Sequence, residues 1–122
     1  MDEYVQAVRQ LACQILELLG EGLGLRDPSS LSRLITATDS DSLLRINHYP
    51  PSAAGDKGAS SVGFGEHSDP QILSVLRAND IDGLQVLLPD GRGEDAWVQV
   101  PADPAAFFIN VGDLLQVRIT SA

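Results

Sequence analysis

Cysteine, aromatic side chains and basic side chains are all scarce in this 122-residue chain. Cys13 is the single cysteine, so no disulfide can form within the chain, and a reducing compartment is expected. Aromatic residues make up 5% of the sequence, which leaves the core to Leu, Ile and Val. The 8 Lys and Arg face 17 Asp and Glu, and the net charge is −9. This balance argues against a nucleic-acid partner and against binding to an anionic membrane surface.

Long hydrophobic runs are also missing. No apolar stretch approaches the roughly 18 residues that a membrane span needs. The chain starts Met1-Asp2-Glu3-Tyr4, without a basic region followed by an apolar core, so no signal peptide is visible. We therefore expect a cytoplasmic protein, and the length predicts a single domain.

Two packing helices are predicted within residues 1–38. Apolar residues recur at three- and four-residue steps over residues 2–19, and Gly20, Gly22 and Gly24 are expected to end this helix. Asp27 as N-cap and Pro28 at the first helical position predict a second, short helix that ends near residue 37.

Residues 42–117 are predicted to form a β-rich core. A strand at 43–49 would place Asn47 and Tyr49 on one face and His48 on the other. A polar loop follows, through residue 61. Further strands are expected at 72–76, 84–88, 96–100 and 106–111, and residues 89–93 are typical of a hairpin turn. Short strands at this spacing favour a β-sandwich or barrel.

One stretch, residues 63–76, carries candidate chemistry. His67 and Asp69 are two residues apart, so on extended backbone both point to one face and could reach one metal ion. An imidazole and a carboxylate are two of the ligands in a 2-His-1-carboxylate triad, which binds Fe(II). Alone, the pair is a weak signal, and a surface loop without chemistry is the alternative.

Five short motifs occur in order along the chain. They are Asn47-His48-Tyr49-Pro50-Pro51, Gly65-Glu66-His67-Ser68-Asp69, Gly83-Leu84-Gln85-Val86, Trp97-Val98-Gln99-Val100 and Asn110-Val111-Gly112-Asp113. Together they resemble the plant 2-oxoglutarate- and Fe(II)-dependent dioxygenases, and within them the gibberellin 2-oxidases (gibberellin 2-beta-dioxygenases). The resemblance covers nearly all of residues 1–117. It implies a mainly β fold: a partial double-stranded β-helix (jelly roll) with N-terminal packing helices.

The resemblance also implies a chemistry. Fe(II) would be the metal, 2-oxoglutarate the co-substrate, and a gibberellin-like diterpenoid acid the small-molecule substrate, hydroxylated at the 2β position. His67 and Asp69 match the first two iron ligands. Tyr49 matches the tyrosine that hydrogen-bonds 2-oxoglutarate, and Asn47 is expected beside it on the same strand face. His48, on the other face, is interpreted as structural.

The chain departs from the family pattern after residue 117. The family's third ligand is a downstream histidine, and no histidine follows His67. Its Arg-x-Ser pair, which grips 2-oxoglutarate, is not matched by the spacing of Arg118 and Ser121. We therefore expect a single, incomplete domain, truncated at both ends relative to the family, in which Fe(II) is held weakly and turnover is doubtful. No catalytic residue is assigned.

Two alternatives stay open. The chain could be an inactive fragment that binds metal weakly, or that associates with a full-length relative through open sheet edges. It could instead be a small cupin-type barrel that uses His48, His67 and Asp69, which the opposite strand face of His48 disfavours.

Overall fold

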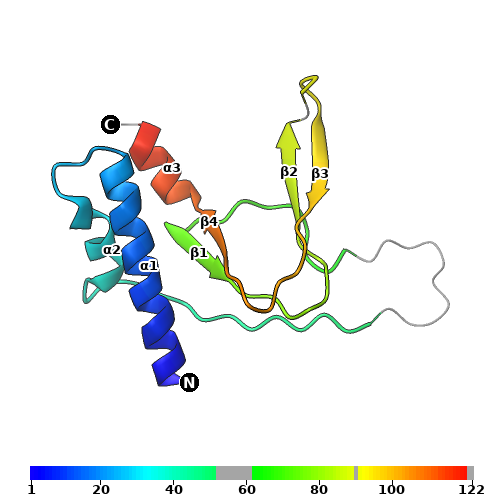
Figure 1. Ribbon diagram of the computed structural model, residues 1–122, viewed down its shortest axis with the longest axis horizontal. Coiled ribbons are helices and arrows are strands. Elements are labelled where there is room, and N and C mark those ends of the chain that lie inside the picture. Colours follow the sequence, from blue (N-terminus) through cyan, green and yellow to red (C-terminus); the bar gives the residue numbers. More distant parts are fainter. Residues whose placement is uncertain (52–61, 90, 121–122) are drawn as a thin grey trace. The chain divides into compact units, whose positions relative to one another are not determined.

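The computed structural model describes residues 1–51, 62–89 and 91–120, and the polar loop predicted before residue 61 lies mostly outside them. Its elements run in the order α1 (Asp2–Gly22), the 3-10 helix η1 (Pro28–Ser30), α2 (Ser32–Thr36), β1 (Leu73–Leu76), β2 (Gln85–Pro89), β3 (Asp95–Gln99), β4 (Phe108–Val111) and α3 (Asp113–Thr120) (Figure 1). The chain divides into two compact units, Met1–His67 and Ser68–Ala122. None of the described helices has both the length and the hydrophobicity of a membrane span.

Helix α1 confirms the predicted first helix and extends beyond its predicted end. Gly20 and Gly22 take helical conformations, and only Gly24, with φ of 68°, adopts the left-handed conformation that ends a helix. The amide of Leu23 donates to the Leu19 carbonyl at 2.9 Å, and the amide of Leu25 to the Gly20 carbonyl at 3.0 Å. Gly24 therefore ends the helix, and Gly20 and Gly22 lie within it.

Gly20 is the point at which η1 packs against α1. Leu16 and Gly20, one turn apart, are the buried residues of α1. A Cβ at Gly20 would lie 2.5 Å from the Pro28 carbonyl oxygen and 2.9 Å from Pro28 Cα. The absence of a side chain at Gly20 thus permits contact between a helix and the backbone of the next element.

Polar contacts fix the short helices to α1 within the same unit. Ser32 Oγ donates to Glu17 Oε1 at 2.9 Å, and Arg9 Nη2 donates to the Ile35 carbonyl, near the end of α2, at 2.8 Å. A carbonyl in the last turn of a helix has no partner within that helix, so Arg9 satisfies a group that water would otherwise bind.

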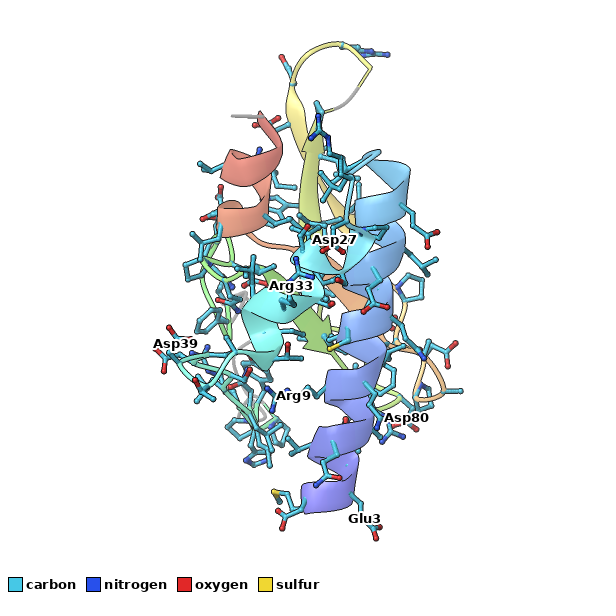
Figure 2. All side chains as sticks on the ribbon, turned by 90° about the vertical axis from the view of Figure 1, so that its left-hand side faces the viewer. Glu3, Arg9, Asp27, Arg33, Asp39 and Asp80 are labelled. Carbon is cyan, nitrogen blue, oxygen red and sulfur yellow. The ribbon has the colours of Figure 1, made fainter. Side chains whose placement is uncertain are left out.

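The predicted N-cap at Asp27 is confirmed. Asp27 Oδ1 accepts from the Ser29 amide at 3.0 Å and from Ser29 Oγ at 2.7 Å, and Arg33 Nη1 lies 2.7 Å from Asp27 Oδ2. Figure 2 shows the Asp27 and Arg33 side chains side by side. The hydrogen bond from Ser29, followed by that from Arg33, lowers the pKa of Asp27 below its usual 3.8.

The four described strands form two antiparallel pairs. β1 pairs with β4, with Leu73 opposite Val111 and Leu76 opposite Phe108. β2 and β3 form the predicted hairpin, and Gly93 in its turn has φ of 87° (Figure 1). The predicted strands at 72–76, 84–88, 96–100 and 106–111 are therefore confirmed, with bounds shifted by one or two residues. The mainly β jelly roll is borne out only in part, because the described residues are a mixture of helices and two partial sheets without a closed barrel.

The strand predicted at residues 43–49 is wrong. These residues have no regular structure and are exposed, including Leu43 at 80% and Ile46 at 79%. Alternation predicts a strand only if another strand lies beside it, because the backbone groups of a single strand stay unpaired. Among the described residues, this segment pairs with none.

Helix α3 was not predicted. The helix starts directly after β4, where the Leu115 and Gln116 amides donate to the Gly112 carbonyl at 3.1 and 3.2 Å. Asp113 in the first turn favours the positive end of the helix dipole, and Leu115 is fully buried. The apolar pattern after Asp113 is too short for its period to be read from sequence.

Replacing Gly20 by alanine is expected to lower the melting temperature of the chain. Alanine favours a helix interior by about 1 kcal/mol over glycine, but here its methyl group would meet the Pro28 backbone, and overpacking costs about 1–3 kcal/mol. Thermal unfolding followed by circular dichroism measures the balance. Gly22→Ala is the matched control, because a Cβ at Gly22 meets nothing within 4 Å and this variant should be as stable as the native chain or more so. Equal shifts in both variants would contradict the packing described for Gly20.

Candidate metal centre

The imidazole of His67 is oriented by its own loop. Nδ1 lies 2.7 Å from the Gly65 carbonyl oxygen, and the Phe64 ring meets the imidazole edge-on, with centroids 4.4 Å apart and planes at 88°. A carbonyl can only accept, so Nδ1 carries a proton, and in the neutral ring the lone pair is then on Nε2. Metal-ligating histidines commonly donate their other ring N–H to a backbone carbonyl in this way. The local backbone thus selects the tautomer that ligates a metal through Nε2.

Tyr49, the predicted 2-oxoglutarate ligand, lies against the same loop. A Cβ added at Gly63 would be 2.6 Å from Tyr49 Cδ1 and 2.9 Å from Cε1. The Tyr49 side chain is 55% exposed, so one side of the ring packs on Gly63 while the rest stays accessible. Two predicted site residues, Tyr49 and His67, are in this way joined through residues 63–67. Asn47 and His48 lie on the exposed 43–50 segment, and the shared strand face expected for Asn47 and Tyr49 does not form.

The carboxylate of Asp69 lies in the second unit, where residues far along the chain contact it. Asn110 Nδ2 lies 3.5 Å from Asp69 Oδ2, and the Asp113 amide donates to the Asp69 backbone carbonyl at 2.8 Å. The Asp69 side chain is partly buried. Contacts from the end of β4 and the start of α3 therefore position this candidate ligand.

Gly112 allows the turn between β4 and α3 to lie directly against the backbone of residues 69–71. The residue is buried, and a Cβ there would overlap the Gln71 carbonyl oxygen and lie 2.9 Å from the Asp69 carbonyl oxygen. The Gly112 amide donates to the Ile72 carbonyl at 3.0 Å, and Ser68 Oγ donates to Asp113 Oδ2 at 2.8 Å. The segment before β1 is thus held along its length by the turn between β4 and α3.

The side chains of His67 and Asp69 are two of the three donors that an Fe(II) site of this type uses. His67 supplies an imidazole and Asp69 a carboxylate, which are the ligand types of the 2-His-1-carboxylate triad. Across residues 1–51, 62–89 and 91–120, no group of three His, Cys, Asp or Glu side chains is arranged to hold a metal. The cupin-type alternative, which needs His48 together with His67 and Asp69, therefore finds no support in the described residues.

Comparison with known proteins decides the family. The profile of the 2OG-Fe(II) oxygenase superfamily matches residues 40–118, which include every predicted site residue. The chain belongs to this superfamily. The superfamily is named for Fe(II) and 2-oxoglutarate, so the family resemblance drawn from the five motifs is confirmed.

Curated relatives in this superfamily are similar over almost the whole chain. Gibberellin 2-beta-dioxygenase 2 of Oryza sativa subsp. japonica is 68% identical over 95% of this chain and 35% of its own length. Gibberellin 2-beta-dioxygenase 1 of the same organism is 54% identical over 95% and 37%, and gibberellin 2-beta-dioxygenase 4 of Arabidopsis thaliana is 55% identical over 93% and 37%. The chain thus spans about a third of the length of the curated relatives it matches. No solved structure matches it.

Several neighbours of the two candidate ligands were not predicted. Phe64 and Gly65 orient His67, while Ser68, Asn110 and Asp113 surround Asp69. The Asn110–Asp113 motif was visible in the sequence as two polar residues at the end of an apolar strand. Its contact with Asp69 was not, because the two segments are 41 residues apart and only strand pairing brings them together.

Replacing Gly63 by alanine is expected to displace the Tyr49 ring, because the new methyl group would occupy the space of Tyr49 Cδ1. The measurement is the chemical shift of the Tyr49 ring protons by NMR. Gly65→Ala is the matched control, since a Cβ at Gly65 meets nothing within 4 Å. A Tyr49 ring that keeps its native shifts in Gly63→Ala would show that this contact does not exist in solution.

Proposed function

We propose that this chain carries the iron- and 2-oxoglutarate-binding residues of a gibberellin 2-beta-dioxygenase, an oxidoreductase that 2β-hydroxylates gibberellins. Three relatives that are 54–68% identical over at least 93% of the chain bear that name, which supports the substrate class. The observation that carries the proposal at the site is the orientation of His67 by the Gly65 carbonyl, which leaves the lone pair on Nε2. A cytoplasmic location is part of the proposal, because a single cysteine suits a reducing compartment.

The described residues have distinct parts in this proposal. His67 binds the metal through Nε2, and the Gly65 carbonyl keeps the proton on Nδ1. Asp69 supplies a carboxylate that offsets part of the charge of a divalent cation. When bound, Fe(II) supplies the redox chemistry that activates O2. The Tyr49 hydroxyl donates a hydrogen bond to 2-oxoglutarate, and Asn47 is the second polar side chain proposed for that co-substrate.

These residues make up part of the site expected from the resemblance. His67 and Asp69 supply two of the three ligands of the triad. The downstream histidine and the arginine of the Arg-x-Ser pair have no match within residues 1–122. Fewer ligands hold a metal more weakly, and an oxoacid dianion without an arginine loses a bidentate charge partner. We propose that residues 1–122 by themselves bind Fe(II) weakly and do not sustain turnover.

The metal-binding part is tested by calorimetric titration of the chain with Fe(II) under anaerobic conditions. His67→Ala and Asp69→Ala are each expected to weaken binding by at least about tenfold, because each removes one of two ligands. His48→Ala is the matched control and should bind as the native chain does. Native binding in His67→Ala, or loss of binding in His48→Ala, would contradict the assignment.

The catalytic part is tested in the same preparation with Fe(II), 2-oxoglutarate, O2 and a gibberellin. A polypeptide of residues 1–122 is expected to form no succinate above a control without protein, because these residues supply only two of the three ligands of the triad. Gibberellin-dependent succinate that disappears in His67→Ala would show that these residues suffice for turnover, and would overturn the expected inactivity while supporting the substrate class.

A second candidate function is association with a longer relative. Each described sheet has only two strands, so every strand has an edge that no other described strand covers. Apolar side chains on these strands are half exposed, including Leu88 at 48%, Trp97 at 50% and Val111 at 52%. Exposed edges and apolar faces favour pairing with a further chain. Sedimentation of the chain should then show self-association or co-sedimentation with such a relative at micromolar concentration, and a monodisperse monomer in both samples would exclude it.

A further inference from the structure

Two segments of the second unit run against each other where β4 meets α3. The Asp113 amide donates to the Asp69 carbonyl at 2.8 Å, and the Gly112 amide donates to the Ile72 carbonyl at 3.0 Å. These bonds continue the β1–β4 ladder, whose last pair joins Leu73 to Val111. The backbone from Asp69 to Ile72 is therefore fixed at both of its ends before β1 begins.

A glycine is required at position 112 because the Gln71 backbone lies too close for a side chain, and not because its φ is positive. The glycines with positive φ in the described residues are Gly24 and Gly93. Gly112 is nevertheless buried, and a Cβ on it would overlap the Gln71 carbonyl oxygen. Any side chain at this position would push the Asp69–Gln71 backbone away from the turn.

Two side chains at the junction of β4 and α3, Asn110 and Asp113, contact residues 68 and 69. Asn110 offers Nδ2, which can only donate, to Asp69 Oδ2, which can only accept, at 3.5 Å. Ser68 Oγ donates to Asp113 Oδ2 at 2.8 Å, so the Asp113 carboxylate is turned toward Ser68. The orientation of the Asp69 carboxylate thus depends on the Asn110 side-chain amide and on two backbone contacts, from the Asp113 amide and from Gly112.

We propose that Asn110, Gly112 and Asp113 are positioning residues that hold the Asp69 carboxylate in the orientation from which it binds a divalent metal. None of the three touches the metal. Gly112 and the Asp113 amide set the backbone of Asp69, and the Asn110 amide sets its side chain. The metal in this inference rests on the proposed function, whereas the orientation of Asp69 is a property of the metal-free chain.

The orientation is tested first without metal. Three-bond couplings measured by NMR report the side-chain rotamers of Asp69, and one rotamer should dominate in the native chain. Asn110→Ala is expected to leave Asp69 averaging over several rotamers. Asn79→Ala is the matched control: Asn79 lies in an exposed turn, where its Oδ1 accepts from the Ile81 amide at 3.1 Å, and its loss should leave Asp69 unchanged.

Metal binding is tested second, with Mn(II) as the probe and the broadening of amide signals near Asp69 as the readout. Asn110→Ala should weaken Mn(II) binding by about 10–100-fold, the range found when a group that orients a metal ligand is removed. Its metal-free melting temperature should match that of Asn79→Ala. Gly112→Ala should weaken Mn(II) binding as well, whereas Gly83→Ala, whose added Cβ meets nothing within 4 Å, should not.

The outcomes separate this inference from the proposed function. Asp69 rotamers that average in the native chain, or that do not change in Asn110→Ala, would overturn the inference whatever Mn(II) does. Native Mn(II) affinity in Asn110→Ala, despite altered rotamers, would overturn it too. A single native rotamer that depends on Asn110, in a chain that binds no Mn(II), would support the positioning of Asp69 and refute the proposed metal site.

Discussion

The second unit depends on the close approach of two backbones at Gly112. Because Gly112 has no side chain, its backbone lies directly against the Asp69–Gln71 segment, and the two segments are close enough to form backbone hydrogen bonds. That contact starts the β1–β4 ladder, sets the residue at which α3 begins and fixes the carbonyl of Asp69. Because the same residues do all three, a change at Gly112 would disturb the sheet end, the helix start and the candidate ligand together. We therefore expect stability and the proposed metal binding to be coupled at this turn.

The two candidate ligands are oriented by different means. His67 is held by residues two and three positions before it, Gly65 and Phe64, so its tautomer depends on a local loop. Asp69 is held by Asn110 and Asp113, more than 40 residues away, so its orientation exists only once β1 and β4 have paired. Local contacts form at low entropic cost, whereas contacts across such a separation require loop closure first. The imidazole is therefore oriented by sequence neighbours, and the carboxylate by the fold.

Sequence was informative where one periodicity or one cap decides the outcome. The apolar stripe of α1, the Asp27 cap and the β2–β3 hairpin are such cases. The assignment of His67 and Asp69 as metal ligands stays a prediction. The sequence was uninformative where the structure of a segment depends on whether another segment packs or pairs with it. Residues 43–49 alternate like a strand, but alternation cannot show whether a pairing strand is present, and none of the described strands forms a ladder with them. Helix α3 and the contacts of Asn110 depend on tertiary packing, which a local pattern does not contain.

The most direct test of the Gly112 contact is native-state hydrogen exchange of the Asp113 amide. If this amide donates to the Asp69 carbonyl inside the folded unit, it should exchange as slowly as the amides of the β1–β4 ladder, because opening it requires separating the same two segments. Exchange as fast as that of the exposed amides at residues 43–49 would show that the turn is not held against Asp69, and would contradict the account.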